Sequence, residues 1–141
     1  VLAEIDHVVE GARVRSERAG LAQRCQVVRC DFFEAVPEGG DGYVMQHIIH
    51  DWDDARASKI LRNIARAMGN KHGSVILLET VIAGGSEPDM GKFIDIEMLA
   101  LPGGRERSAE EFRLLLAGAG FRLTRIVPTR SSVSVIEAVR E

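Results

Sequence analysis

The stretch Tyr43-Val44-Met45-Gln46-His47-Ile48-Ile49-His50-Asp51-Trp52 decides how the rest of the chain is interpreted. It begins as a short apolar strand and ends in polar and aromatic groups, and a helix is predicted to begin at Asp53. A strand that turns at once into a helix places the imidazole of His50 at the carboxyl edge of a sheet, where open α/β folds bind ligands. Because an imidazole titrates near neutrality, we interpret His50 as a general base that takes a proton from a substrate hydroxyl.

The composition is that of one globular domain, which we place at residues 1–141. The formal net charge of -3 gives no electrostatic reason to expect nucleic acid or an anionic membrane as a partner. No apolar run approaches the roughly 20 residues of a membrane span and no signal-peptide pattern opens the chain, so we expect a cytoplasmic protein. The sequence begins at Val1, inside an apolar segment and without an initiator Met, which suggests that it was cut from a longer protein.

The two cysteines, Cys25 and Cys30, are predicted to be free thiols. They lie five residues apart on one predicted strand, so their side chains point to opposite faces and cannot bond to each other within it. Their spacing fits no metal-site pattern, and no cluster of His and Cys ligands is present in the sequence. No metal is therefore predicted.

Apolar periodicity and turn residues predict strands that alternate with helices. Most strand-to-strand connections run through helices, which predicts a doubly wound α/β fold with a mostly parallel sheet. The last two strands are close in sequence, with Pro128 between them, and predict an antiparallel hairpin at one sheet edge. The predicted strands cover residues 1–3, 24–30, 43–49, 74–78, 121–127 and 132–138, and the predicted helices cover 7–20, 53–68, 91–101 and 109–117.

Two helices carry the clearest local signals. In the helix at 53–68, apolar residues recur at spacings of three and four, an aspartate stands at its start and Gly69 follows its end. For the helix at 109–117 the signal is Ser108, which lies three residues before Glu111. This spacing predicts a capping box at the start of that helix. These patterns predict helix ends as well as helix positions.

Four residues that can bind polar groups each end a predicted strand: Glu4, Asp31, His50 and Glu79. In a parallel sheet these ends lie side by side along the carboxyl edge. Ionised carboxylates there suit ribose hydroxyls and amino groups, because they accept several hydrogen bonds at once. The alternative is that the acids cap the helices that follow them, although four such residues together are harder to explain in that way. His47 is interpreted as an ordinary sheet residue.

Four motifs occur in the same order and at similar spacings in a known family: Asp31-Phe32-Phe33, His47-Ile48-Ile49-His50-Asp51-Trp52, Leu78-Glu79 and Gly103-Gly104-Arg105-Glu106-Arg107. Through them the chain resembles, over essentially all of its length, the S-adenosylmethionine-dependent small-molecule O-methyltransferases. This family includes the caffeic acid, flavonoid, acetylserotonin and bacterial polyketide enzymes. The resemblance implies a Rossmann-like class I methyltransferase fold, with S-adenosyl-L-methionine as cofactor. It also implies methyl transfer to a hydroxyl of a small aromatic or polyketide-like molecule.

The resemblance implies a role for each matching residue. His50 matches the family's catalytic base, and Glu79 and Glu106 match the two acids that flank and orient it. This agrees with the reading from the residues alone, because a carboxylate beside an imidazole selects its tautomer and stabilises the imidazolium.

The resemblance also implies the cofactor contacts. Glu4 matches the acid that holds the ribose hydroxyls, where the family more often has Asp. Asp31 and Phe32 match the adenine contacts, and Trp52 is expected against the same ring. Gln46 matches a further cofactor contact, at a position where many members have Lys. Two later residues, Ile94 and Met98, match the substrate pocket, and a plain core role is equally open for both.

The family's first strand, its glycine-rich cofactor loop and its N-terminal helical dimerisation domain have no counterpart before Glu4. Since that first strand lies between the strands of Glu4 and His50, we expect either a gap in the sheet or a rearranged sheet. We also expect weak cofactor binding and little or no turnover by the chain alone. The whole protein is expected to be a homodimer.

The alternative function is a degenerate, non-catalytic binding or dimerising module, which has no need for the three catalytic residues. A nucleotide-dependent oxidoreductase is disfavoured because its glycine fingerprint is absent.

Overall fold

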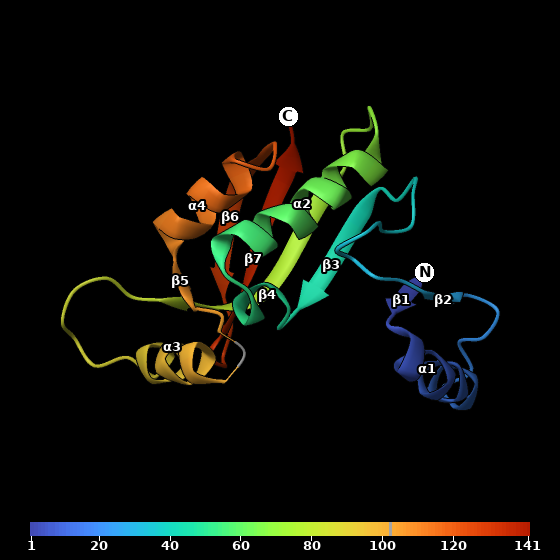
Figure 1. The fold of residues 1–141 in the computed structure, drawn as a ribbon, viewed down its shortest axis with the longest axis horizontal. Coiled ribbons are helices and arrows are strands. Elements are labelled where there is room, and N and C mark those ends of the chain that lie inside the picture. The colour runs from blue at the N-terminus through green and yellow to red at the C-terminus, as the bar shows by residue number, and fades with distance from the viewer. Residues whose placement is uncertain (102) are drawn as a thin grey trace.

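The computed structural model describes residues 1–101 and 103–141, and the α/β class predicted from the sequence is confirmed (Figure 1). The described residues form two separate sheets, the smaller with one helix beside it and the larger with several. None of the described helices is long and apolar enough to span a membrane. The elements in chain order are β1 (Leu2–Glu4), α1 (Asp6–Arg18), β2 (Val27–Arg29), β3 (Gly42–Gln46), the 3₁₀ turn η1 (Ile49–Asp51), α2 (Asp54–Met68), β4 (Ser74–Ile82), α3 (Met90–Ala100), β5 (Arg107–Ser108), α4 (Ala109–Ala117), β6 (Phe121–Pro128) and β7 (Val133–Arg140).

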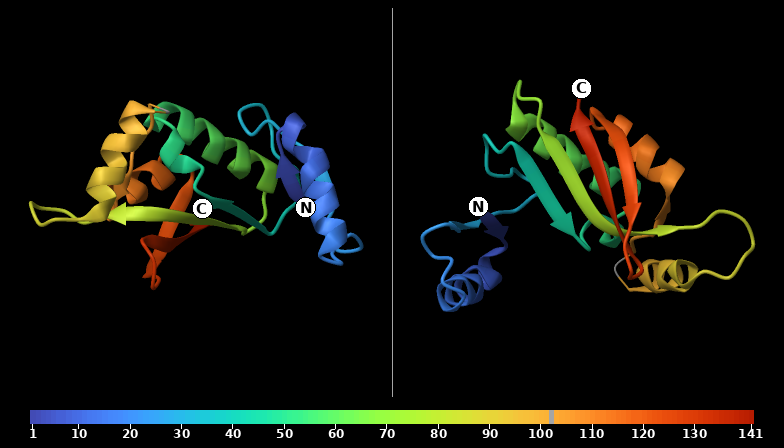
Figure 2. Two further views of the ribbon diagram at one scale, coloured as in Figure 1. Left: turned by 90° about the horizontal axis from the view of Figure 1, so that it is seen from below. Right: turned by 180° about the vertical axis from the view of Figure 1, so that it is seen from behind.

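The larger sheet has the strand order β3-β4-β7-β6, with the short β5 beside the end of β4. Strands β3 and β5 run parallel to β4, whereas β7 runs antiparallel to both β4 and β6. The predicted antiparallel hairpin at one edge is therefore confirmed. Helices α2 and α4 lie on one face of this sheet, behind the strands in the right panel of Figure 2. No helix covers the opposite face within residues 1–101 and 103–141.

The smaller sheet consists of β1 and β2, which pair in parallel with Glu4 opposite Arg29. As far as the structure describes the chain, β1 does not pair with β3, so the gap expected between the strand of Glu4 and the strand that leads to His50 is present. The sequence predicted that residues 1–3 end a buried strand. That prediction is wrong, because Leu2 and Ala3 are exposed: β1 pairs on one side only.

One hydrophobic core lies between the larger sheet and the helices α2 and α4. The apolar stripe of α2 is buried there as its periodicity predicts, and burial of each large aliphatic side chain stabilises the fold by about 1.5–3 kcal/mol. Asp53 caps α2 by accepting from the backbone N–H of Arg56, and the predicted capping box of Ser108 and Glu111 opens α4. The fully buried large residues of the core include Ile60, Leu61, Ile64, Met68, Leu77, Phe112, Leu116, Phe121 and Ile136.

Three predicted strands differ from the structure by three or more residues at one end. The strand predicted to run to Ile49 ends at Gln46, so His50 lies on η1 beyond the strand rather than at its tip. The strand predicted to end at Leu78 continues to Ile82, because its extra residues pair with β7 and β5. The strand predicted at 24–30 is only Val27–Arg29, and both cysteines flank it as free thiols in the described structure.

Candidate active site

The turn that follows β3 is held by hydrogen bonds to Glu79, which lies in the interior of β4 rather than at its end. The Oε1 atom of Glu79 accepts from the backbone N–H of Ile48 at 3.0 Å and from that of Ile49 at 2.8 Å. The side chain of Ile49 is fully buried in the core and anchors the turn from the other side. Together these contacts place His50 above the end of the larger sheet.

The structure brings the three predicted catalytic residues together. Nδ1 of His50 lies 2.9 Å from Oε1 of Glu106 and 3.8 Å from Oε2 of Glu79. On the other side of the ring, Nε2 lies 3.4 Å from Oδ1 of Asp51. Both glutamates are buried, whereas the His50 side chain keeps 12% of its surface exposed. The imidazole is thus reachable from solvent while its orienting acids are not.

These contacts change the proton affinities of the site. The hydrogen bond with Glu106 raises the pKa of His50 most, and the nearby carboxylates raise it further, against the lowering effect of burial. Burial raises the pKa of Glu79, although the two backbone N–H groups that it accepts from act in the opposite direction. An ionised Glu106 favours the tautomer of His50 that carries its proton on Nδ1, and this tautomer leaves Nε2 free to accept a proton.

Two contacts position Glu106. Its backbone N–H donates to Oδ1 of Asp95 in α3 at 2.8 Å, and the N–H of the preceding Arg105 donates to the carbonyl of His50 at 2.8 Å. The chain passes so close to His50 that a Cβ atom on Gly104 would lie 2.0 Å from that carbonyl oxygen. Only glycine fits at position 104, which explains the second glycine of the motif.

Arg107 belongs to the glycine-arginine motif, but the sequence alone predicts no role for it. Its guanidinium is buried and donates to Oδ1 of Asp54 at 2.8 and 3.0 Å, to the carbonyl of Trp52 at 2.8 Å and to that of Ile49 at 3.1 Å. It therefore connects β5 to the turn that carries His50. The one available signal was its place directly after Glu106.

His47 is not the sheet residue that the sequence predicted. It follows the last residue of β3, its backbone has a φ of 51°, and its side chain is exposed. Its ring lies 5.3 Å from the ring of His50, measured between centroids. The left-handed turn at His47 thus places a second imidazole beside the candidate base.

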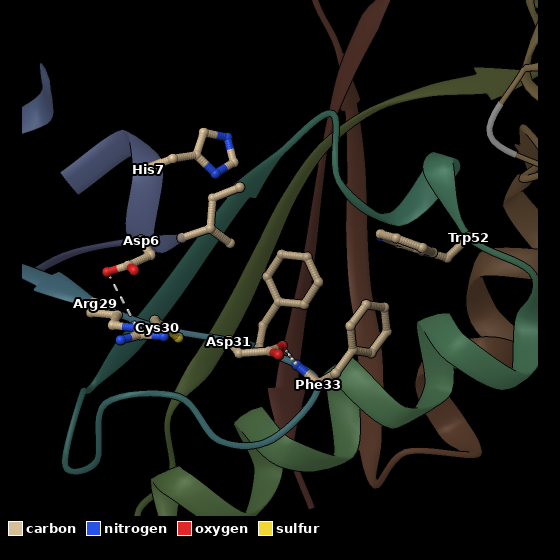
Figure 3. A pocket seen from close by; sticks show the side chains of 9 residues that line it. Asp6, His7, Arg29, Cys30, Asp31, Phe33 and Trp52 are labelled. Atoms are coloured by element: carbon tan, nitrogen blue, oxygen red, sulfur yellow. Dashed lines mark hydrogen bonds and ion pairs between the residues drawn. The ribbon is translucent and has the colours of Figure 1, made fainter.

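An open pocket of about 440 Å³ lies between β2, the start of α1 and Trp52 (Figure 3). Asp31 and Phe32, two of the predicted cofactor residues, line it. The ring of Phe33 meets that of Trp52 edge to face, with centroids 4.8 Å apart, and Nε1 of Trp52 is buried without a hydrogen-bond partner among the described residues. Aromatic side chains together with the carboxylates of Asp6 and Asp31 suit a planar heterocycle that carries an amino group.

The other two predicted cofactor residues lie outside this pocket. Glu4 ends β1, where its carbonyl accepts from the N–H of Cys30 at 2.8 Å, and its side chain does not line the pocket. Gln46 is an exposed residue at the end of β3. The predicted single row of four strand ends is therefore split: His50 and Glu79 lie together beside the larger sheet, and Glu4 belongs to the smaller sheet.

Comparison with known proteins gives consistent matches. A family model described as an O-methyltransferase domain matches residues 1–122. The phenazine O-methyltransferase of Lysobacter antibioticus is 45% identical over 138 residues, which are 98% of this chain and 40% of that protein. The mitomycin biosynthesis 6-O-methyltransferase of Streptomyces lavendulae is 39% identical over 140 residues, which are 99% of this chain and 40% of that protein.

Solved structures match equally well. The crystal structure of LaPhzM has a TM-score of 0.92 and 44% identity, over 99% of this chain and 42% of that one. The O-methyltransferase NcsB1 from neocarzinostatin biosynthesis, in complex with S-adenosylmethionine and 2-hydroxy-5-methyl naphthoic acid, has a TM-score of 0.87 and 36% identity, over 99% of this chain and 40% of that one. The chain thus spans about 40% of the length of the relatives that it matches.

Proposed function

The chain belongs to the O-methyltransferase domain family, and on that premise we propose that it supplies the catalytic residues of an S-adenosylmethionine-dependent methyltransferase. The TM-scores of 0.92 and 0.87 also confirm the Rossmann-like class I fold that the resemblance implied. The acceptor that we propose is a hydroxyl of a small aromatic or polyketide-like molecule. The observation that carries this proposal is the 2.9 Å contact between His50 and Glu106, with the buried Glu79 beside it.

The proposed mechanism assigns one task to each side chain. Nε2 of His50 takes the proton of the acceptor hydroxyl, so that the oxygen becomes a better nucleophile. Glu106 accepts a hydrogen bond from Nδ1–H of His50. The charges of Glu106 and Glu79 then stabilise the imidazolium that forms. S-adenosylmethionine supplies an already activated methyl group on its sulfonium, so alignment and deprotonation are the main tasks left to the protein.

We propose the pocket beside Trp52 as the site of the adenine ring. Asp31 there offers a carboxylate to an amino group, and Phe32 and Trp52 offer aromatic surface to the ring. The partnerless Nε1 of Trp52 is consistent with a bound polar group at this place. Glu4 and Gln46 stay predictions as cofactor residues, because their side chains do not line the same pocket.

A second acceptor class is favoured by one relative. The 8-amino-8-demethylriboflavin N,N-dimethyltransferase of Streptomyces davaonensis is 37% identical over 118 residues. A base in the position of His50 serves an amine equally well, since an amine also loses a proton when it is methylated. The non-catalytic module stays as the alternative from a different class, and a homodimer stays a proposal for the whole protein.

A hybrid enzyme tests the function directly. This chain replaces the matched segment of the Lysobacter phenazine O-methyltransferase, and methyl transfer to a phenazine acceptor is measured for the hybrid and for its His50→Ala and His72→Ala variants. His72 is exposed and serves as the matched control. We expect His50→Ala to lower kcat by about 10²–10⁴-fold with cofactor binding retained, and His72→Ala to have no effect.

Two outcomes would contradict the proposal. Equal kcat values for the hybrid and its His50→Ala variant would mean that the hydroxyl ionises without His50. A folded hybrid that binds S-adenosylmethionine but transfers no methyl group would favour the non-catalytic module.

A further inference from the structure

We propose that His47, His50 and Glu79 form a binding site for a first-row divalent cation of the Zn²⁺ class, and that occupancy of this site weakens His50 as a base. The inhibitory part of this proposal rests on the proposed function of His50. The cation site itself rests on geometry and charge alone. The proposed mechanism gives no task to His47, so this residue separates the two ideas experimentally.

The geometry of the three side chains carries the proposal. Each offers one ligand atom, and these three atoms lie within 4.8 Å of one another. His47 reaches this position because its backbone adopts a left-handed φ of 51°, which is uncommon outside glycine and turns its ring toward that of His50. The pair of imidazoles is therefore a product of the turn and not of regular strand geometry.

Glu79 supplies the observation that points to a ligand. Its Oε1 atom is used by the two backbone N–H groups of the turn, whereas Oε2 is buried and has no hydrogen-bond partner in the described part of the chain. This oxygen lies 3.8 Å from Nδ1 of His50. A buried carboxylate oxygen without a partner costs free energy, and a cation held between it and the imidazole nitrogens removes that cost.

The surrounding charges favour a cation. The carboxylate of Glu106 is also buried and keeps one oxygen, Oε2, without a partner among residues 1–101 and 103–141, and Asp51 lies on the far side of the His50 ring. Arg107 is the one buried arginine or lysine among the described residues, and it donates its hydrogen bonds to Asp54 and to backbone carbonyls. Negative charge around the two imidazoles is thus not balanced by a guanidinium that faces them.

The donor set selects the class of cation. Imidazole nitrogens suit Zn²⁺ and its first-row neighbours, whereas Mg²⁺ and Ca²⁺ prefer an all-oxygen shell. Bonds of about 2.0–2.2 Å place neighbouring ligands of a tetrahedral zinc site about 3.4 Å apart, so the three atoms need to close by on the order of 1 Å. The exposed side chain of His47 has the freedom to make that movement.

Occupancy would inhibit methyl transfer for a stated reason. On the side of the ring that faces Glu79, the cation replaces the proton that Nδ1 of His50 shares with Glu106, and that proton is released to solvent. Nδ1 then carries a positive ion, which lowers the basicity of Nε2 on the same ring. The base is therefore weakened without being removed.

The first test measures binding without any activity. Calorimetric titration of the 141-residue chain with ZnCl₂ is compared for the wild type, His47→Asn and His72→Asn. Asparagine tolerates a left-handed backbone, so His47→Asn removes the imidazole with little strain. We expect one Zn²⁺ per wild-type chain, an affinity at least about tenfold lower in His47→Asn, and no change in the exposed control His72→Asn.

Thermal unfolding provides a second readout that also reports whether each variant is folded. A ligand that binds the native state raises the unfolding midpoint, so Zn²⁺ is expected to raise it for the wild type and His72→Asn and not for His47→Asn. Equal Zn²⁺ affinity in the wild type and His47→Asn would overturn the site. An equal loss of Zn²⁺ affinity in His47→Asn and His72→Asn would also overturn the site, because the affinity would then depend only on the number of histidines in the chain.

The inhibitory role is tested in the hybrid enzyme, with each rate compared with the same protein's rate in the presence of a chelator. Zn²⁺ is expected to inhibit the wild-type hybrid and its His72→Asn variant more than the His47→Asn variant. Equal inhibition of all three would overturn the inhibitory role. An inactive hybrid would count against the proposed function, while the titration would still decide the cation site.

Discussion

Nδ1 of His50 lies 2.9 Å from Oε1 of Glu106, although 56 positions separate the two residues in the chain. The contact exists because the backbone at Gly104 passes against the carbonyl of His50, and because Asp95 accepts a hydrogen bond from the N–H of Glu106. Local helix or strand signals do not encode such a contact.

Glu106→Gln should lower the activity of the hybrid enzyme and move its pH profile. The base works when unprotonated, so the rate rises with pH through the pKa of His50, which Glu106 raises above its usual value of about 6.5. The substitution replaces the hydrogen bond to a carboxylate, which is the largest cause of that rise, with a weaker hydrogen bond to a neutral amide. The acid limb of the kcat profile should therefore move to lower pH while the maximum rate falls. An acid limb that stays in place would contradict this role.

Glu79→Gln should change how the stability of the chain depends on pH. Because burial raises the folded pKa of Glu79 above its unfolded value, the stability that this group contributes is fully present below the unfolded pKa. It is lost as the pH rises through the folded pKa. The unfolding free energy of the wild type, measured relative to Glu79→Gln, should therefore fall as the pH rises from the usual carboxyl range toward neutrality. Urea unfolding of both proteins across this range provides the measurement, and parallel curves would contradict the assignment.

Arg107→Met should destabilise the chain by about 1–3 kcal/mol, since it leaves the carbonyls of Ile49 and Trp52 without their buried donor. The matched control is Arg113→Met, because Arg113 is half exposed and pairs only with the neighbouring Glu110. That control should stay within about 0.5 kcal/mol of the wild type. Urea unfolding of the wild type and both variants measures their free energies of unfolding. Equal effects of the two substitutions would refute a special role for Arg107.

Gly104→Ala should displace the turn that carries His50, because its Cβ atom would lie 2.0 Å from a backbone oxygen that cannot rotate away. We expect a loss of about 1–3 kcal/mol in stability and a lower kcat in the hybrid enzyme. Gly84→Ala is the control, since a Cβ atom there would meet nothing within 4 Å. Wild-type activity in Gly104→Ala would show that the close approach is not required.

The chain alone should bind S-adenosylmethionine weakly. The proposed adenine pocket is open, and the side chains of Glu4 and Gln46 do not line it together with Asp31 and Phe32. Weak binding follows, since few groups can contact the cofactor at the same time. Calorimetric titration of the 141-residue chain tests this, and a micromolar dissociation constant would refute it.

Local sequence was sufficient to predict those elements whose ends and pairing depend on residues close together in the chain. The apolar period and the aspartate cap predicted α2 to within one residue at its start, and Ser108 with Glu111 predicted the start of α4. The short connection of the last two strands predicted their antiparallel pairing. In each case the deciding interactions join residues that are close in the chain, so the pattern alone contains them.

Tertiary structure alone decided how the site is put together. The turn after β3 is held by Glu79, about thirty positions further on, so His50 lies on η1 and His47 turns beside it instead of continuing the strand. Strand β4 extends past Glu79 because β7 and β5 pair with it, and Arg107 is buried because distant carbonyls accept from it. The sequence determined which candidate catalytic side chains the chain offers. Long-range hydrogen bonding and packing decided which of them meet, since no local pattern records those partners.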